Sequence, residues 1–386
     1  MLKSSLLIWV LILLIVPILH AQNPAPGIEH TARYFPLLSG KKIGLVVHQA
    51  SRFENSSLKT HLVDSLLHSG MKISKIFAPE HGFKGTADAG EYITDGSYQN
   101  IPVISLYGKN KKPSLEQMQG LDFMIFDLQD VGARFYTYLS TLHYVLQTCA
   151  EAQIPLLILD RPNPNGHYVD GPVLNLDFQS FVGMHPIPIV HGLTLAEMAQ
   201  MILGEHWLGL DKSLELIVVP IQNYTHQTPY TLPIPPSPNL PNAHAIALYP
   251  SLCLLEPTAI SVGRGTSMQF QIYGHPSFSS GNFSFTPEPN LGAKNPKLKG
   301  QECFGKDLRG ASRPTQIELQ WLIDAFRSYA GEAPFFHSGF ERIAGVGSLK
   351  KQIQEGLSEA AIRQSWETEL SKFKKMRKNY LIYPED

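Results

Sequence analysis

Short apolar runs alternate with segments of helical periodicity between residues 42 and 223, and this alternation restricts the fold more than any other feature of the chain. The predicted strands cover residues 43–48, 73–77, 103–107, 123–127, 155–160 and 214–221, and the predicted helices cover 58–69, 113–118, 138–152 and 194–206. The runs are apolar throughout, which is typical of strands buried on both faces of a parallel sheet. We therefore predict an α/β domain over residues 28–232. Thr194 and Glu197 have the spacing of a capping box at the start of its last helix.

The pattern changes after Asn223. Residues 233–241 are too rich in proline for a helix or a central strand, and they indicate an extended linker or an ordered surface loop. Short strands are predicted between Thr258 and Phe285, and helices over 316–329, 349–356 and 358–380. We therefore predict a second, smaller α+β domain over residues 233–386.

Composition excludes several classes of function. The chain has 386 residues, 43% of them hydrophobic and 17% charged, which suits about two globular domains. The net charge of -1 comes without a basic stripe, so we predict no nucleic-acid partner. Cys149, Cys253 and Cys303 are too scattered for a disulfide framework, and neither cysteines nor histidines show a metal-ligand spacing. No glycine-rich dinucleotide motif follows the first strand, so we predict neither a metal nor a cofactor.

The first residues have the pattern of a secretory signal peptide. Lys3 precedes an apolar stretch from Leu6 to Leu19, and Ala21 offers a small residue for cleavage. We predict a signal peptide over residues 1–21 and a mature protein in the periplasm or at the cell surface. An uncleaved membrane anchor is the alternative. The rest of the chain has no apolar stretch of 18 residues, so we predict no stable membrane span after cleavage.

Glu80 is the first candidate for chemistry. It lies in Phe77-Ala-Pro-Glu-His-Gly-Phe83, directly after a predicted buried strand. Ligands of open α/β sheets bind at the carboxyl ends of strands. A carboxyl group held in a turn at that edge can be partly desolvated and act as a proton donor near neutral pH. The adjacent His81 either contacts a ligand, orients Glu80 or binds a backbone carbonyl group.

Other acidic residues end neighbouring strands. Asp127 and Asp160 end two predicted strands, and Asp130 follows the first of them closely. Parallel strands align these ends, so the carboxylates and Glu80 are expected to converge on one cleft, where mutual burial raises the pKa of one carboxyl group. Alternatively, Asp127 and Asp160 cap helices or bind backbone amides of loops.

Arginine and aromatic residues supply candidate substrate ligands. Arg134 and Arg161 can each bind a carboxylate or phosphate with two parallel hydrogen bonds, or can pair with a neighbouring aspartate. Tyr136 and its aromatic neighbours can stack on a sugar ring or belong to the core. In the second domain, two glycines flank Arg264, and Glu256 is either a further acid or its ion-pair partner.

These segments together resemble the NamZ-type exo-β-N-acetylmuramidases, glycoside hydrolase family 171. The resemblance covers residues 40–383 and is carried by ordered motifs, namely His48-Gln-Ala-Ser51, Pro79-Glu-His-Gly-Phe83, Asp127-Leu-Gln-Asp-Val-Gly-Ala-Arg-Phe-Tyr-Thr-Tyr138, Leu159-Asp-Arg-Pro-Asn-Pro-Asn-Gly166, His191-Gly-Leu-Thr194, Pro235-Pro-Ser-Pro-Asn-Leu240 and Ser261-Val-Gly-Arg-Gly-Thr266. One departure is Glu256-Pro-Thr-Ala259, where the family often has Glu-Gly-Thr-Asn.

The resemblance implies a Rossmann-like domain joined to a smaller C-terminal domain, with the active site between them. It implies release of N-acetylmuramic acid from the non-reducing end of peptidoglycan-derived MurNAc-GlcNAc fragments, in cell-wall turnover or recycling. The family's catalytic glutamate corresponds to Glu80. The residues we then expect to line the cleft are Asp130, Arg134, Tyr136, Asp160, Arg161, Asn163, Glu256 and Arg264, with His81 and Asp127 beside them.

The chemistry of the expected substrate narrows the roles. Glycoside cleavage needs an acid to protonate the leaving oxygen, which we assign to Glu80. N-acetylmuramic acid carries a lactyl carboxylate, and we expect Arg134, Arg161 or Arg264 to bind it. A non-catalytic muropeptide-binding protein on the same scaffold is the main alternative. An ester or amide hydrolase is a weaker one, because the sequence has neither a Gly-x-Ser-x-Gly nor a His-Glu-x-x-His motif.

Overall fold

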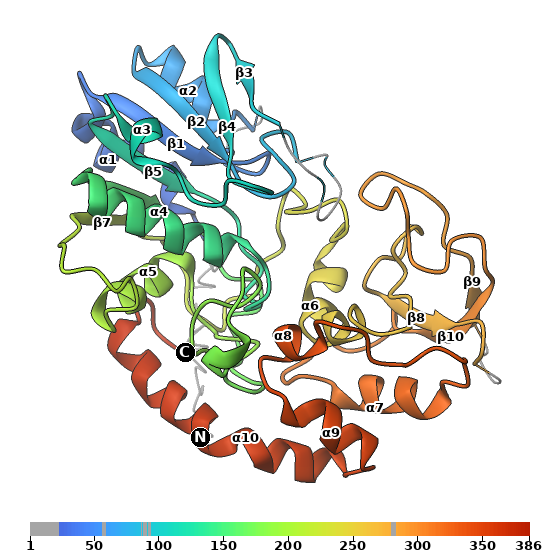
Figure 1. Ribbon diagram of the computed structural model, residues 1–386. Helices are drawn as coiled ribbons and strands as arrows, with labels where there is room; N and C mark the ends of the chain where they lie inside the picture. The colour runs from blue at the N-terminus through green and yellow to red at the C-terminus, as the bar shows by residue number, and fades with distance from the viewer. Residues whose placement is uncertain (1–22, 56–58, 86, 88–90, 92–93, 279–282) are drawn as a thin grey trace, which may run out of the picture.

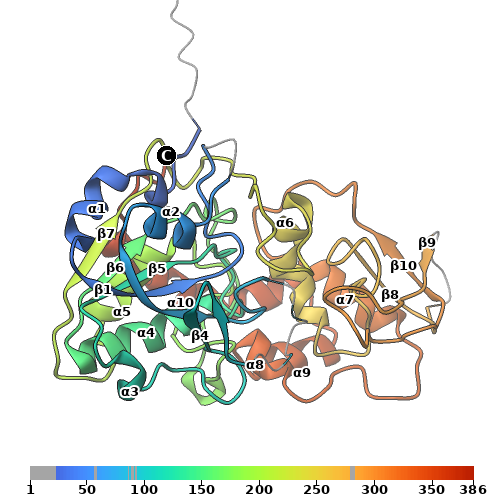
Figure 2. The same ribbon diagram turned by 90° about the horizontal axis from the view of Figure 1, so that it is seen from above.

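The chain forms two lobes that lie side by side (Figures 1 and 2). The computed structural model describes residues 23–55, 59–85, 87, 91, 94–278 and 283–386. The predicted signal peptide over residues 1–21 lies outside the described residues. Within the described part of the chain, no helix has the length and apolar character needed to cross a membrane.

A seven-stranded sheet forms the centre of the first lobe, with the order β3-β4-β2-β1-β5-β6-β7. Its strands are β1 (Lys42–Val47), β2 (Lys72–Ala78), β3 (Gly96–Tyr98), β4 (Ile101–Ser105), β5 (Phe123–Asp127), β6 (Leu156–Leu159) and β7 (Leu216–Val219). All neighbours pair in parallel except β3, which is antiparallel to β4 at the edge of the sheet. The parallel α/β architecture predicted from the apolar runs is confirmed, and the short β3 was not predicted.

Helices bury both faces of this sheet, as the continuous apolar runs require. In β1, Ile43, Leu45 and Val47 belong to one buried cluster and Val46 to another, because successive side chains point to opposite faces. The first cluster includes side chains of α1 (Thr31–Leu38) and α2 (Leu62–His68). The second includes side chains of α3 (Leu115–Met118), α4 (Tyr138–Ala152) and α5 (Leu195–Gly204). The short helix η1 (Gly27–Glu29) precedes α1, and η2 (Leu176–Phe178) lies between β6 and α5.

The capping box predicted at the start of α5 is present. Thr194 Oγ1 accepts a hydrogen bond from the Glu197 amide, and Glu197 Oε2 accepts one from the Thr194 amide at 2.9 Å. Both side chains are buried. Two amide groups that the first helical turn leaves unpaired are therefore satisfied inside the protein.

The second lobe is smaller and mixed. Its helices are α6 (Ala243–Leu252), η3 (Cys253–Leu255), α7 (Leu319–Ser328), α8 (Phe340–Ala344) and α9 (Ser348–Gln354), and its strands β8 (Ile272–His275), β9 (Phe283–Phe285) and β10 (Cys303–Asp307) form an antiparallel sheet in the order β8-β10-β9. The predicted α+β character is confirmed. Helices α6 and α8 and strand β10 were not predicted from the sequence.

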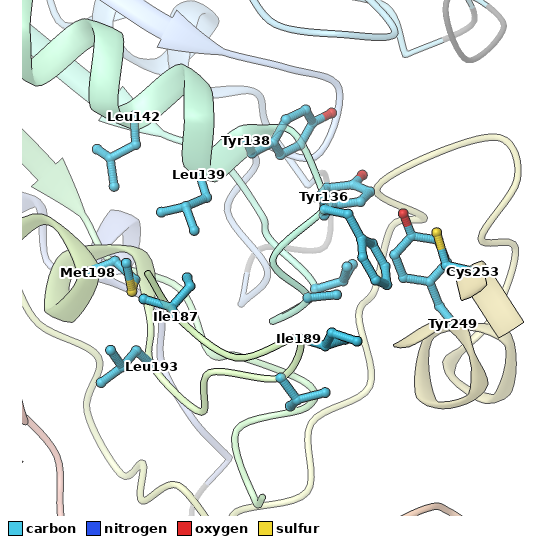
Figure 3. Close-up of a cluster of buried hydrophobic side chains, with 14 of the residues drawn as sticks. Tyr136, Tyr138, Leu139, Leu142, Ile187, Ile189, Leu193, Met198, Tyr249 and Cys253 are labelled. Carbon is cyan, nitrogen blue, oxygen red and sulfur yellow. The ribbon is translucent and has the colours of Figure 1, made fainter. Parts of the chain in front are cut away.

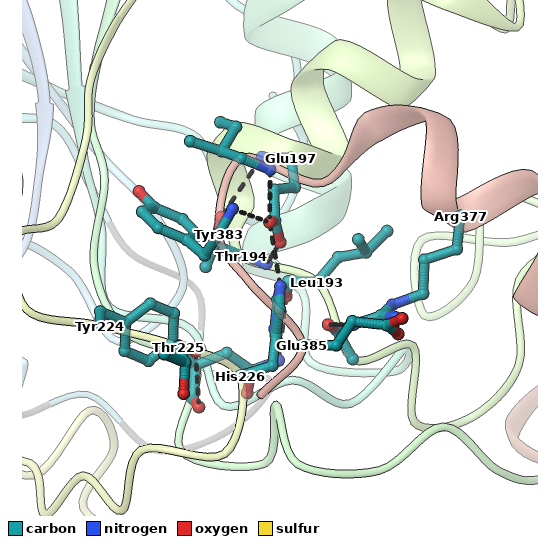
Figure 4. A network of polar contacts seen from close by, with 12 residues as sticks. Leu193, Thr194, Glu197, Tyr224, Thr225, His226, Arg377, Tyr383 and Glu385 are labelled. Atoms are coloured by element: carbon teal, nitrogen blue, oxygen red, sulfur yellow. Dashed lines mark hydrogen bonds and ion pairs between the residues drawn. The ribbon is translucent and has the colours of Figure 1, made fainter.

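The end of the chain returns to the first lobe. Helix α10 (Glu359–Arg377) runs from α9 toward α5 and continues into η4 (Lys378–Tyr380), which contacts α5 (Figure 1). The buried Glu197 Oε1 accepts hydrogen bonds from the Ile382 amide at 2.9 Å and the Tyr383 amide at 3.3 Å, and it also contacts His226 Nε2 at 3.0 Å (Figure 4). The boundary placed at residues 232/233 stays a prediction, and the last residues pack against the lobe that precedes it.

Candidate active site

A cavity of about 180 Å³ lies between the lobes, at the carboxyl end of the parallel sheet. Residues from both lobes line it: Glu80, His81, Tyr107, Phe135, Tyr136, Thr137 and Val182 from the first, and Ser237, Asn239, Leu240, Tyr249, Cys253, Glu256, Arg264, Phe270 and Ile343 from the chain after residue 232. Five of the eleven residues predicted for the site are at this cavity, namely Glu80, His81, Tyr136, Glu256 and Arg264.

Glu80 is held by hydroxyl groups of the first lobe. Strand β2 ends at Ala78, and Glu80 occupies the turn that follows. Thr137 Oγ1 donates a hydrogen bond to Glu80 Oε2 at 2.6 Å, and Tyr107 also hydrogen-bonds the Glu80 side chain. Burial and the nearby Glu80 carboxylate raise the pKa of Tyr107, so its phenol keeps its proton and can donate. Tyr138 approaches the Glu80 backbone carbonyl at 3.4 Å.

The turn itself is conformationally unusual. His81 has a φ of 68° and Gly82 a φ of 75°, both in the left-handed region. A non-glycine residue rarely adopts such a backbone, and strained positions of this kind concentrate at functional sites. His81 Nδ1 lies 2.9 Å from the Ala87 carbonyl oxygen, which is the structural contact that the sequence analysis left open as an alternative. His81 therefore helps fix the turn that carries Glu80.

The second lobe contributes an ion pair to the cavity. Arg264 Nη2 lies 2.8 Å from Glu256 Oε2, and the guanidinium group lies over the ring of Phe270 at 5.3 Å. Burial lowers the pKa of Arg264 and the Glu256 carboxylate raises it, with a net rise, so the guanidinium is charged. The ion pair that the sequence analysis offered as an alternative is present, and it stands in the cavity wall.

Aromatic rings from the two lobes meet at the cavity. Tyr136 contacts Tyr138 edge-on with ring centroids 4.8 Å apart, and Phe135 contacts Tyr249 edge-on at 5.3 Å. The hydroxyl group of Tyr136 donates to the Pro236 carbonyl at 3.1 Å. Figure 3 shows Tyr136 facing Tyr249, whose hydroxyl group lies beside the sulfur of Cys253. Burial raises the pKa of the Cys253 thiol, so this sulfur is a neutral part of the wall.

Asp127 and Arg161 do not line the cavity but neutralise each other. Arg161 Nε and Nη2 donate to the two Asp127 carboxylate oxygens at 2.5 and 3.0 Å, and both side chains are almost completely buried. Asp127 is the last residue of β5 and Arg161 lies two residues after the neighbouring β6, so the alignment of the strand ends brings them to each other rather than to a ligand. Their predicted contact with substrate has no support in this geometry.

Arg134 is a structural cation. Its Nη1 donates to the Pro172 and Ile187 carbonyls, and its Nη2 donates to the Ile343 and Ala344 carbonyls, all at 2.8 to 2.9 Å. Burial lowers its pKa to about 9. The guanidinium thus joins the first lobe to the end of α8 in the second and is not available to a substrate carboxylate.

The remaining three predicted ligands hold loops and helix ends. Asp130 Oδ2 accepts from the Gly132 amide at 2.7 Å, and Asn163 Oδ1 accepts from the Asn165 amide at 2.8 Å. Asp160 Oδ1 accepts from the Ala196 amide at 3.1 Å, in the first turn of α5. Burial raises the pKa of both Asp130 and Asp160 to about 7. For Asp160, this contact matches the alternative in which an acidic residue at a strand end caps a helix or binds a backbone amide.

Several cavity residues were not predicted. Thr137 lies in the motif that carries Arg134 and Tyr136, and the spacing gave no sign that its hydroxyl group would reach Glu80. Ser237 and Asn239 lie in the proline-rich segment, which is an ordered wall of the cavity. Within the described ranges, no group of three His, Cys, Asp or Glu side chains is arranged to hold a metal ion.

Comparison with known proteins identifies the family. The N-terminal domain of the exo-β-N-acetylmuramidase NamZ matches residues 43–244, and its C-terminal domain matches residues 247–383. The chain belongs to the NamZ family. A curated relative, the peptidoglycan β-N-acetylmuramidase NamZ of Bacillus subtilis strain 168, is 35% identical over 381 residues, which cover 91% of this chain and 89% of the relative.

Two solved structures share this fold. A crystal structure of a DUF1343 family protein from Bacteroides fragilis has a TM-score of 0.86 and 43% identity, covering 95% of this chain and all of that one. A second Bacteroides fragilis protein of this description has a TM-score of 0.78 and 24% identity over 93% of this chain and 99% of that one, and it shows the fold alone. The two-domain NamZ architecture thus extends over nearly the whole described chain.

Proposed function

We propose that the protein is a glycoside hydrolase that releases N-acetylmuramic acid from the non-reducing end of MurNAc-GlcNAc fragments of peptidoglycan. Family membership supports the reaction class, because the curated relative is named as a peptidoglycan β-N-acetylmuramidase. The observation that carries the proposal for this chain is Glu80, held in a cavity that also contains a charged arginine from the other lobe.

The size of the cavity suits exo-action. About 180 Å³ is below the range of roughly 300–1,000 Å³ that is usual for small-molecule sites. A small cavity of this kind suits a single terminal sugar unit better than a continuous glycan strand. Aromatic side chains in its wall provide flat apolar surface for a sugar ring.

Glu80 is assigned as the general acid. Protonated, it would give its proton to the glycosidic oxygen as the bond to the anomeric carbon breaks, so that the leaving sugar departs as a neutral alcohol. A water molecule then supplies the hydroxyl group at the anomeric carbon of the released N-acetylmuramic acid and the proton that restores the acid. The Thr137 hydroxyl group holds one oxygen of the Glu80 carboxyl group in place. Because the carboxyl group is planar, this contact also sets the direction of its other oxygen. Glu256 is the other carboxylate at the cavity, and its ion pair with Arg264 suits a role in orienting that guanidinium.

Arg264 is assigned to the lactyl carboxylate. Of the three arginines considered from the sequence, Arg134 and Arg161 are occupied away from the cavity, and Arg264 is at its wall. A guanidinium group binds carboxylates through parallel N–H donors. N-acetylglucosamine lacks the lactyl group, so this contact would select muramyl over glucosaminyl substrates.

Two leaving groups test the role of Glu80. Glu80→Gln keeps the shape and the Thr137 contact but has no acidic proton. With a MurNAc-GlcNAc disaccharide, kcat should fall roughly 10²-fold or more. The second substrate is a nitrophenyl β-N-acetylmuramide. With this substrate the loss in kcat should be much smaller, because nitrophenolate is a stable anion and leaves without taking up a proton. Glu215→Gln, at an exposed position, is the control. Equal losses on both substrates would refute the acid role.

Substrate selectivity tests the role of Arg264. Arg264→Gln should lower kcat/KM for the nitrophenyl muramide by roughly 10- to 100-fold, the scale of a lost hydrogen bond to a charged group. The residual rate on the nitrophenyl glucosaminide should change little. Equal loss on both would exclude a contact with the lactyl group.

An extracytoplasmic location is proposed from the N-terminal sequence. The charged start, apolar stretch and Ala21 support export. Amino-terminal sequencing of the protein recovered from the producing cell should begin at Gln22. Recovery of an intact Met1 in the soluble cytoplasmic fraction would contradict export.

A further inference from the structure

Lys297 occupies an unusual position beneath the cavity wall of the second lobe. Its Nζ donates hydrogen bonds to three backbone carbonyls, those of Glu256 at 2.8 Å, Thr258 at 2.6 Å and Ile260 at 2.9 Å. An ammonium group has three N–H donors and no acceptor. All three donors are therefore used on alternate residues of a single segment.

That segment leads from one member of the cavity ion pair to the other. It begins at Glu256, whose own carbonyl is one of the three acceptors, and it continues to Arg264. No strand is assigned to residues 256–265, and the segment is paired with other described segments through two isolated bridges, Thr258 with Phe336 and Ser261 with Gly274. A loop of this kind needs other contacts to hold its side chains at fixed positions.

The chain next to Lys297 also clamps the far end of the loop. Gly265 has a φ of 81°, and a Cβ atom placed there would lie 2.6 Å from Pro296 Cγ and 2.7 Å from the Glu288 carbonyl oxygen. The Glu288 amide in turn donates to the Gly265 carbonyl at 2.8 Å. Pro296 and Lys297 thus hold the loop on both sides of the residues that bring Arg264 to the cavity.

We propose that Lys297 is a positioning residue for substrate recognition, which fixes the 256–265 loop so that Glu256 and Arg264 present a preformed site to the carboxylate of the muramyl group. This inference rests on the proposed function of Arg264. A ligand binds more tightly to groups already held in place, because less conformational entropy is lost on binding. Lys297 itself does not line the cavity, so it acts through the loop.

The charge of Lys297 is needed for this arrangement. A neutral amine has two N–H donors and a lone pair, so one of the three carbonyls would lose its partner. Burial lowers the pKa of Lys297 to about 8, while Glu256 raises it and Arg264 lowers it. His275 and His337 lie close enough to Lys297 for its positive charge to lower the pKa of each imidazole. The ammonium form therefore holds the loop at neutral pH.

Binding of N-acetylmuramic acid tests the proposal. Lys297→Met keeps most of the volume and removes the ammonium group. Its Kd for N-acetylmuramic acid, measured by calorimetry at pH 7, should be roughly 10-fold weaker than that of the unchanged protein. Its Kd for N-acetylglucosamine should change little. The exposed Lys299→Met is the matched control and should change neither value. An unchanged Kd for N-acetylmuramic acid in a folded Lys297→Met protein would overturn the inference.

Hydrogen exchange separates this inference from the proposed function. In Lys297→Met, amides of residues 256–265 should exchange faster, while those of strand β5 should not. If the loop loosens but Arg264→Gln leaves selectivity unchanged, Lys297 positions the loop and the lactyl assignment is wrong. If selectivity depends on Arg264 but the loop keeps its protection, the positioning role of Lys297 is wrong.

The unchanged protein gives an independent readout that does not depend on a variant folding. Its KM for the nitrophenyl muramide should rise as the pH passes about 8 and Lys297 loses its proton. A KM that is flat between pH 7 and 9.5 would contradict the role of the ammonium group.

Discussion

Thr137 donates its hydroxyl hydrogen to Oε2 of Glu80 at 2.6 Å, although it stands at the N-cap position of α4. A threonine at this position ordinarily accepts a hydrogen bond from an amide of the first helical turn. Here its side chain makes no such bond. The hydroxyl group therefore orients the proposed acid, Glu80, instead of capping the helix.

This contact predicts a catalytic loss without a large loss of stability. Thr137→Val removes the hydroxyl group and keeps the shape, so kcat on the MurNAc-GlcNAc disaccharide should fall about 10-fold, the scale of one lost hydrogen bond, because the Glu80 carboxyl group loses a contact that orients it. Thr141→Val, one turn further along α4, is the control, because its hydroxyl group bonds the Thr137 carbonyl and not Glu80. Steady-state rates decide the matter, and equal effects of the two changes would exclude a special role for Thr137.

Gly345 should tolerate a methyl group poorly because of Arg134. A Cβ atom at this position would lie 2.4 Å from Arg134 Nη2, and the backbone φ is 81°. Gly356 has a similar φ of 75° with open space around it. Gly356→Ala should therefore cost about 1 kcal/mol of unfolding free energy through backbone strain, whereas Gly345→Ala should cost about 3 kcal/mol or more. Urea unfolding of both variants measures the difference, and equal costs would show that the guanidinium moves freely.

The raised pKa of Asp160 predicts that the stability of the protein depends on pH. Its pKa in the folded protein is raised to about 7 by burial, above the value of about 3.9 for an exposed aspartate. The folded state therefore binds the proton more tightly. The stability that this provides is fully present below about pH 4 and is lost as the pH rises through 7, with a slope of up to about 1.4 kcal/mol per pH unit.

Asp160→Asn has no proton to lose at this position. The unfolding free energy of the unchanged protein should therefore fall relative to that of Asp160→Asn between pH 4 and 7. Asp211→Asn, at an exposed position, should show no such trend. Denaturant titrations at pH 4, 5.5 and 7 test this, and a constant difference between the two curves would show that the pKa of Asp160 is not raised.

The buried pair of Asp127 and Arg161 should be costly to break. Asp127→Asn leaves a buried guanidinium with Glu54, at 3.3 Å, as its remaining carboxylate partner. Loss of about 3–5 kcal/mol of unfolding free energy is expected. Glu369→Gln, which breaks the exposed pair with Lys372, should cost less than about 1 kcal/mol. Comparable costs would mean that water reaches Arg161.

The sequence was sufficient for the architecture of the first lobe because its strands are buried on both faces. Every strand from β1 to β7 except the short β3 was predicted, and β5 and α4 were predicted with the observed bounds. Helix α6 was missed because Pro250 lies inside it. Proline leaves the carbonyl four residues earlier without its partner, and here the Asn165 side chain donates to that Ile246 carbonyl at 3.0 Å. Such a distant compensation has no local signal.

The position of a site residue could be predicted where a turn fixes the backbone. It was harder to predict where a charged side chain can bind either a neighbouring charge or a substrate. Glu80 was found from the strand and turn around it. Asp127 and Arg161 were expected to face a ligand, but strand alignment places them next to each other, and two opposite charges within reach pair before either meets a substrate. Whether an arginine faces a neighbour or a cavity depends on side-chain packing that a single sequence does not encode.

The return of α10 to the first lobe restricts how the two lobes can move relative to each other. A lobe on one tether can swing in any direction, but this one is attached both through residues 223–242 and through the residues after α10 that bind Glu197. The Arg134 guanidinium adds hydrogen bonds to the Ile343 and Ala344 carbonyls between these two attachments. With three connections to the first lobe, the second lobe has little freedom to swing, and the cavity keeps its shape when it is empty.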